Sequence, residues 1–196
     1  MTVNQVYQTC LYAVAKNKQD GYFSPEDFYI VINQAQRSYL DYLKGEYQKY
    51  QLNRPIAVVE FGQNQMIRQS LAPLIYSAIL SPNTTTGIAP FPTNFEYTDS
   101  MLTYGFYHIR FIQQDRQSAY VRSKIDPISS NPVYLIQHEG FHFYPENLGY
   151  AEMSYIRTPP SIVWGNVPDS NGIPVWNPTT SQEPVWSDTD AWQIII

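Results

Sequence analysis

The residues best suited to chemistry in this sequence are His138, Glu139 and His142, which form an H-E-x-x-H pattern. On a helix, this spacing places both imidazoles on one face, one turn apart. There they can bind zinc while the glutamate acts as a base. A zinc hydrolase built on these three residues is therefore one possible function.

The sequence around this motif favours strands instead of a helix. The segment VYLIQHEGFHFYP is rich in β-branched and aromatic residues, and Gly140 and Pro145 both oppose a helix. Residues four apart on a strand are separated by roughly 13 Å, which is too far to share one zinc ion. We predict a hairpin whose turn is Glu139-Gly140, with His138 opposite Phe141.

Other reactive side chains have simpler explanations. Cys10 lies on the apolar face of a predicted helix, where a packed thiol is expected. The acidic pairs Glu26/Asp27 and Asp188/Asp190 suit the first turns of helices. Phosphate-binding glycine motifs and the G-x-S-x-G nucleophile motif are absent from the sequence. We therefore predict a protein that is not an enzyme and has no catalytic, cofactor-binding or metal-binding residues.

Binding to nucleic acid is also not favoured. Aromatic residues alternate with arginines over residues 104–122, which could stack on a single strand. Acidic residues balance this segment, and residues 131–196 carry one basic side chain, Arg157, against seven acidic ones. Without a basic patch, a tight grip on DNA is not expected. The acidic final third could line a channel or face a basic partner. In the earlier aromatic segment, the arginines and the acidic residues that balance them are Arg110, Arg116, Arg122, Asp115 and Asp126.

The composition indicates a protein with interfaces. Only 15% of the 196 residues are charged, against roughly 25% in typical domains, and 17 are tyrosine. Tyrosine offers a large rigid contact area with a polar tip, which suits surfaces that become buried against partners. A β core with tyrosines at its edges would give the same composition. The single cysteine, the lack of a signal peptide and the short apolar runs predict a soluble protein that folds in a reducing cytoplasm.

Two helices are predicted to open the chain as a helical hairpin over residues 1–55. Apolar residues from Val3 to Val14 recur at gaps of three and four, and a polar turn follows at Asn17. The second helix begins with Ser24 as cap and Pro25 at its first position, and extends to about Leu52. Its predicted apolar stripe is Phe28, Val31, Ile32, Ala35, Tyr39, Tyr42, Leu43, Tyr47 and Tyr50.

A mixed and mainly antiparallel β region is expected over residues 56–160. Ile56–Phe61 is predicted as a strand and Asn64–Leu71 as a short helix, while the three prolines of SPNTTTGIAPFPTN indicate irregular structure. The strands predicted after it are MLTYGFYHIRFI, SAYVRSKI, VYLIQH, FHFYP and AEMSYIRT. Residues 161–196 are predicted to form an extended Pro/Trp-rich arm, with a capping box at 187–190 that would open a last helix. The predicted fold class is α+β.

Two blocks of the sequence carry a family resemblance. The first runs from Gly21-Tyr22-Phe23-Ser24-Pro25-Glu26-Asp27-Phe28 to Asn33-Gln34-Ala35-Gln36. The second contains Pro132-Val133-Tyr134, Phe141–Pro145, Tyr155-Ile156-Arg157, Pro159 and Trp164. In this order, over about 75 residues, they resemble structural proteins of crAss-like and related Bacteroidetes tailed phages.

The resemblance implies a head–tail connector or portal-associated ring protein, usually in twelve copies around the DNA channel. The expected partners are further copies of the chain, the portal and neighbouring connector or tail proteins, with at most non-specific proximity to DNA and no membrane. The expected location is the virion, assembled in the cytoplasm of the host bacterium. Another virion β module, such as a tail or fibre-associated protein that binds glycans through Trp164, Trp176 and Trp186, is the alternative.

Overall fold

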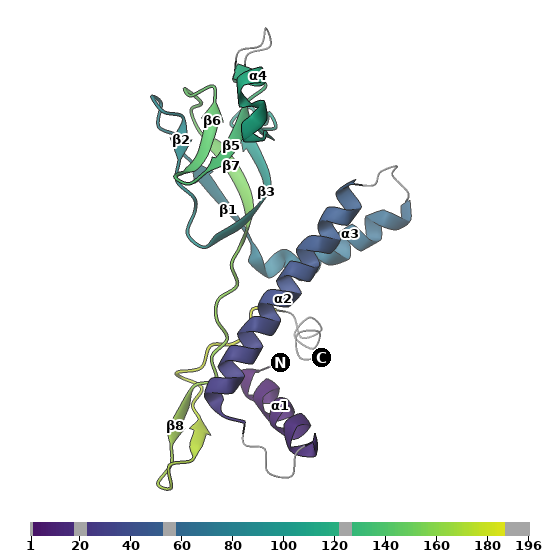
Figure 1. The fold of residues 1–196 in the computed structure, drawn as a ribbon, viewed down its shortest axis with the longest axis vertical. Coiled ribbons are helices and arrows are strands. Elements are labelled where there is room, and N and C mark those ends of the chain that lie inside the picture. Colours follow the sequence, from purple (N-terminus) through teal and green to yellow (C-terminus); the bar gives the residue numbers. More distant parts are fainter. Residues whose placement is uncertain (1, 18–22, 53–57, 122–126, 187–196) are drawn as a thin grey trace. The chain divides into compact units, whose positions relative to one another are not determined.

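The computed structural model describes residues 2–17, 23–52, 58–121 and 127–186, which form an α+β fold (Figure 1). As predicted, helices open the chain and mainly antiparallel sheets follow. The chain divides into two compact units. The first combines Met1–Pro73 with Pro159–Ile196, and the second is Leu74–Thr158. Among the described residues, no helix is both long enough and apolar enough to cross a membrane.

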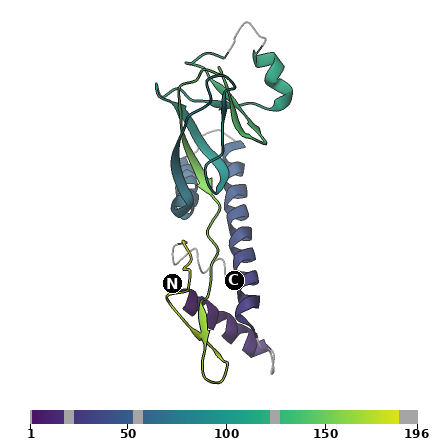
Figure 2. The same ribbon diagram turned by 90° about the vertical axis from the view of Figure 1, so that its left-hand side faces the viewer.

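The two predicted N-terminal helices are confirmed as α1 (Val3–Asn17) and α2 (Pro25–Leu52). Figure 2 shows α2 as one uninterrupted helix. Ser24 caps it: the Ser24 hydroxyl oxygen accepts a hydrogen bond from the Asp27 N–H at 3.0 Å, and the Asp27 carboxylate accepts one from the Ser24 N–H at 3.2 Å. The hydrogen bonds from Ser24 lower the pKa of Asp27 below its ordinary value.

The buried face of α2 differs from the predicted stripe. Val31 and Tyr42 are 54% and 61% exposed, so their place in the stripe was wrong. The side chains of Tyr47 and Tyr50 lie outside the described residues. The face that is buried includes a glutamine, which hydrophobicity alone could not place there. Its fully buried members are Phe28, Ile32, Gln36, Leu40 and Leu43.

A third helix, α3 (Val58–Leu71), contacts α2 within the first unit. It includes the predicted helix at Asn64–Leu71 and corrects the predicted strand at Ile56–Phe61, because residues 58–61 are helical. Residues 56 and 57 lie outside the described part of the chain. A four-residue apolar run such as IAVV fits a strand or a buried helix equally well by periodicity. A short 3-10 helix, η1 (Ala72–Leu74), ends this region.

The C-terminal arm is extended but contains one small hairpin. Strands β8 (Asn166–Pro168) and β9 (Pro174–Trp176) pair antiparallel, with Val167 opposite Val175. The turn between them is closed by the Asp169 carboxylate, which accepts hydrogen bonds from the Asn171 and Ile173 N–H groups at 2.8 and 2.9 Å. The predicted capping box at 187–190 lies outside the described residues.

The second unit contains two sheets. In the first, β1 (Ile75–Leu80) and β3 (Phe95–Thr103) flank β7 (Ala151–Arg157), and both pair with it antiparallel. The second sheet has the order β2-β6-β5-β4, and its β4–β5 pair is parallel. Its strands are β2 (Ile88–Ala89), β6 (Gly140–Tyr144), β5 (Val133–Gln137) and β4 (Arg110–Phe111). β2 therefore lies inside the segment that was predicted to be irregular.

Side chains from both sheets form one core between them. Phe141 and Phe143 of β6 are fully buried against Met153 of β7 and Met101 of β3. The opposite face of β5 and β6 is covered by a smaller cluster in which Ile112 and Tyr120 pack against Val133, Leu135 and Tyr144. The two sheets are thus stacked as a small sandwich, in agreement with the predicted mainly antiparallel region.

Tyr120 belongs to a short helix, α4 (Gln117–Val121), preceded by the 3-10 turn η2 (Gln114–Arg116). The prediction of a strand over SAYVRSKI was therefore wrong for residues 118–121, and residues 122–126 lie outside the described chain. Packing explains the difference. Tyr120 covers the apolar face of β5, and the Gln117 side chain donates a hydrogen bond to the Tyr144 hydroxyl.

Candidate interaction site

The H-E-x-x-H residues form a hairpin tip. His138 and Glu139 are exposed in the turn, and Gly140 opens β6 opposite Gln137. The hairpin was predicted correctly, but its turn lies one residue earlier than predicted, and Phe141 therefore faces Ile136. Gly140 has a φ of 140°, and a Cβ there would collide with the carbonyl oxygen of Ala89. The glycine of the motif is thus explained by the close approach of β2.

The second histidine of the motif lies on a strand. His142 pairs with Leu135 on one side and Ile88 on the other, and its ring lies 4.6 Å from that of Tyr144 with a tilt of 33°. Its Nδ1 lies 3.4 Å from the Tyr144 hydroxyl oxygen. The helical geometry that gives this motif its zinc chemistry does not occur at these residues. Within the described chain, no group of three or more histidine, cysteine or acidic side chains could hold a metal ion.

Two of the three tryptophans predicted to bind glycans are buried. Trp164 and Trp186 are each 5% exposed. The Trp164 indole N–H donates to the side-chain oxygen of Asn4 at 3.1 Å. Trp176 is half-buried, and its indole N–H donates to the Ser181 hydroxyl at 3.0 Å. These side chains hold the arm in place, so Trp164 and Trp186 do not offer a surface to a glycan.

Two polar residues of α2, Asn33 and Gln36, hold the C-terminal arm by side-chain hydrogen bonds, which we term the clasp. The Asn33 amide accepts a hydrogen bond from the Ile162 N–H at 2.8 Å and donates one to the Ile162 carbonyl at 3.0 Å. Gln36, which is 3% exposed, donates to the Pro160 carbonyl at 3.0 Å and accepts from the Trp186 indole N–H at 2.9 Å. The N-Q-A-Q motif therefore satisfies backbone groups of the arm that no sheet covers.

The other candidate residues are dispersed. Cys10 is half-buried, and burial raises the pKa of its thiol, which makes it a poor nucleophile. Arg110 is exposed and donates a hydrogen bond to Asn131 at 2.8 Å. Arg116 and Asp115 are exposed in η2, His108 is exposed in a β-bridge with Leu102, and Arg122 and Asp126 lie outside the described residues. Those of these residues that the structure describes do not converge on one catalytic constellation.

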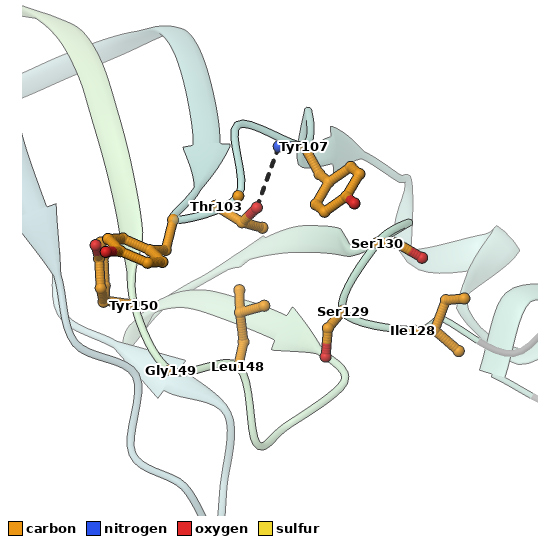
Figure 3. A pocket seen from close by; sticks show the side chains of 10 residues that line it. Thr103, Tyr107, Ile128, Ser129, Ser130, Leu148, Gly149 and Tyr150 are labelled. Atoms are coloured by element: carbon orange, nitrogen blue, oxygen red, sulfur yellow. Dashed lines mark hydrogen bonds between the residues drawn. The ribbon is translucent and has the colours of Figure 1, made fainter.

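Sequence reasoning missed a tyrosine-lined pocket in the second unit. It has a volume of about 680 Å³ and lies between three short segments: Thr103–Tyr107, Ile128–Ser130 and Leu148–Tyr150. Figure 3 shows Tyr150 on one side of the pocket and Tyr107 and Ser130 on the other, with Leu148 between them. No lining residue carries a formal charge at neutral pH. The pocket therefore suits an apolar or neutral group.

The segment Thr103–Tyr107, which we term the aromatic loop, presents three large rings to solvent. Tyr104, Phe106 and Tyr107 are 76%, 79% and 50% exposed. Hydrogen bonds close the loop tightly: the Thr103 N–H donates to the Tyr107 carbonyl, and the Tyr107 N–H donates to the Thr103 hydroxyl. The rings are thus displayed on a fixed backbone.

Phe106 has a φ of 61°, in the left-handed region that bulky residues rarely occupy. This conformation costs about 1–2 kcal/mol relative to right-handed backbone. The exposed ring buries too little surface to offset that cost within the chain. A phenylalanine held in this conformation and left in water is an outlier that packing within its own unit does not explain.

Two charged residues lie close in the chain or by a hydrogen bond to residues that line the pocket. Arg110 donates a hydrogen bond to Asn131, which follows the lining residues Ile128–Ser130. Glu152 is on β7, two residues after the lining residue Tyr150. The pKa of Tyr150 is raised by desolvation, with smaller contributions from Tyr104 and Glu152. Like any tyrosine at neutral pH, Tyr150 carries a protonated hydroxyl that can donate a hydrogen bond. The rings of Tyr104 and Tyr150 meet edge to face at 5.2 Å.

The pocket was missed because its parts are far apart in sequence. The sequence predicts TYGFY as the interior of a strand, although Gly105 between aromatic residues is a signal for a turn.

Comparison with known proteins does not identify a family for this chain. No protein-family model matches it, and no curated protein matches it significantly.

Proposed function

We propose that this protein is a structural subunit of a tailed-phage head–tail connector, which forms a homo-oligomeric ring stacked on the portal around the DNA channel. The observation that carries the proposal is the aromatic loop, where three large rings are exposed on a strained and hydrogen-bonded backbone. Such a surface suits a protein that is buried in an assembly.

The hydrogen bonds between α2 and the arm join residues from the two blocks on which the proposed family resemblance rests. Asn33 and Gln36 belong to the first block of the resemblance, and Pro159 and Trp164 flank the arm residues of the second block that they bind. The first block and the end of the second block therefore lie together in the first unit, whereas residues 132–157 of the second block belong to the second unit.

The partners that we propose are copies of this chain, the portal and neighbouring connector or tail proteins, within the virion. The role requires binding surfaces and no chemistry, which fits the dispersed reactive residues described above. DNA would pass close to the protein without specific contacts, because Arg110, Arg116 and Arg157 are separated along the fold and acidic residues outnumber basic ones in the sequence.

The zinc alternative has a direct test. The purified chain should contain no stoichiometric zinc by elemental analysis, and a chelator should leave its thermal unfolding midpoint unchanged. Stoichiometric zinc that is lost in the double variant His138→Ala/His142→Ala would support the hydrolase instead.

The ring proposal is tested by co-purification. A tagged copy of the chain, expressed in infected host cells, should copurify with portal and with untagged copies of itself. The double variant Tyr104→Ser/Phe106→Ser should reduce this recovery while its unfolding midpoint stays close to that of the parent, because both rings are more than three-quarters exposed. Recovery of the tagged chain alone, with neither portal nor untagged copies, would count against the proposal.

A further inference from the structure

We propose that the β8–β9 hairpin of one copy inserts into the tyrosine-lined pocket of the next copy, and that this contact is the lateral interface of the ring. This inference rests on the proposed ring function and specifies its interface. In this contact, the hairpin and the pocket each bind a second copy of this chain.

The hairpin has apolar side chains that its own unit leaves uncovered. Val167, Ile173 and Val175 are 51%, 59% and 53% exposed, and Val167 and Val175 are direct cross-strand neighbours on one face. In both ribbon views the hairpin projects from the rest of its unit (Figures 1 and 2). Pro168 ends β8 and Pro174 begins β9. Because proline has no backbone N–H, neither residue can donate a ladder hydrogen bond to a further strand.

The pocket is a concave counterpart. Its volume of about 680 Å³ can hold several aliphatic side chains, and Leu148, Tyr107 and Ile128 supply apolar contacts. Tyr150 and Ser130 offer hydroxyl groups to a partner backbone. The projecting apolar hairpin and the uncharged aromatic pocket match in polarity.

Charge sets the orientation of this contact. Asp169 is the only charged residue between positions 159 and 182, and it lies at the tip of the hairpin. Arg110 donates a hydrogen bond to Asn131, the chain neighbour of the pocket residue Ser130, whereas Glu152 is two residues from the pocket residue Tyr150. We therefore expect Asp169 to lie on the Ser130 side of the pocket, closer to Arg110 than to Glu152.

The arrangement also has the symmetry that a ring requires. The hairpin belongs to the first unit and the pocket to the second, so each copy carries both halves of the contact at different places. A contact between two different surfaces is head-to-tail, and it generates a closed ring when the rotation between copies closes. A contact between two identical surfaces would give a dimer instead.

Single-cysteine cross-linking tests the contact. The only native cysteine is removed by Cys10→Ser, and one new cysteine is introduced per chain: Tyr107→Cys in the pocket or Ile173→Cys in the hairpin. The two variants are coexpressed with tags of different size, and the assembled protein is treated with a short bis-maleimide. Because the two cysteines lie on different chains, every heterodimeric product reports a contact between copies.

The matched control is Ser38→Cys, which places an exposed cysteine on α2, outside both surfaces. The 107–173 product should exceed the 107–38 and 173–38 products by about tenfold, because a specific contact raises the local concentration of the two thiols. The 107–107 and 173–173 products should be as rare as the controls. Equal yields in all pairs, or a dominant 107–107 product, would overturn the proposal.

Native mass measurement on the same samples separates this inference from the proposed function. Rings observed without the 107–173 product would exclude the hairpin contact and leave the ring function standing. A monomeric mass for samples prepared with and without portal would contradict both. The variant Val175→Thr, which keeps the β-branched shape but makes the side chain polar, should weaken assembly without lowering the unfolding midpoint.

Discussion

Gln36 and Phe106 both depart from what hydrophobicity predicts, and for opposite reasons. Gln36 is a polar residue in the core of its unit, where its amide binds the Pro160 carbonyl and the Trp186 indole. Phe106 is an apolar residue in water, on a backbone that favours glycine. The first departure stabilises the fold, and the second opposes it.

Replacing Gln36 should destabilise the first unit. Gln36→Ala leaves the partly buried Pro160 carbonyl and the buried Trp186 indole N–H without these hydrogen bonds, which should lower the free energy of unfolding by about 1–3 kcal/mol. Gln34→Ala, two residues away and exposed on the same helix, should change it by less than about 0.5 kcal/mol. Urea unfolding followed by tryptophan fluorescence measures both. Equal effects of the two substitutions would contradict the clasp.

Replacing Phe106 should not destabilise the second unit. In Phe106→Gly, the relief of left-handed backbone strain, about 1–2 kcal/mol, is partly offset by the flexibility of glycine, about 0.5–1 kcal/mol. The free energy of unfolding should therefore stay the same or rise slightly. Tyr107→Gly, at a position without positive φ, should lower it. A loss for Phe106→Gly larger than that for Tyr107→Gly would mean that Phe106 serves the fold.

At the scale of elements, the start of α2 was predictable because its signals are local. Ser24, Pro25 and Asp27 act within one turn, and the structure places each where capping chemistry requires. Whether the segments of α3 and α4 form helices or strands was not predictable, because short apolar runs fit both. For α4, the packing of Tyr120 on β5 favours the helix. The tyrosine pocket depends on three loops that only the assembled sandwich brings together.

The cap of α2 should make stability depend on pH. The pKa of Asp27 is lower in the folded state than in the unfolded state. The ionised carboxylate therefore adds to the free energy of unfolding above the unfolded-state pKa, and this stabilisation is lost as pH falls through the folded-state pKa. Asp27→Asn should therefore be less stable than the parent at pH 7, and the difference should shrink towards pH 2. Thermal unfolding across this range measures it. A difference that is independent of pH would show that the Asp27 charge does not contribute.

The corner between β2 and β6 should require Gly140. Gly140→Ala forces a side chain against the backbone of Ala89 at a φ that favours glycine, which should cost about 1–3 kcal/mol. Gly149→Ala is the matched control, because a Cβ there meets nothing within 4 Å. Its unfolding midpoint should stay close to that of the parent. Equal midpoints for the two variants would contradict the hairpin geometry at His138–His142.

At the scale of the whole molecule, the chain leaves the first unit at Pro73 and returns to it at Pro159. The sequence predicted an α+β order of elements, and this order is confirmed. It could not reveal that the arm folds back onto the first helices, because the side-chain bonds of Asn33 and Gln36 join residues more than 120 positions apart. Each unit also exposes large apolar side chains, which the proposed assembly into a ring would cover.

The mass of the assembled protein tests the central claim most directly. Native mass spectrometry of the purified chain, alone and after mixing with portal from the same particle, should give a closed oligomer of many copies. Negative-stain images of the same sample should show rings. A chain that stays monomeric under both conditions and never joins a portal ring would contradict the account.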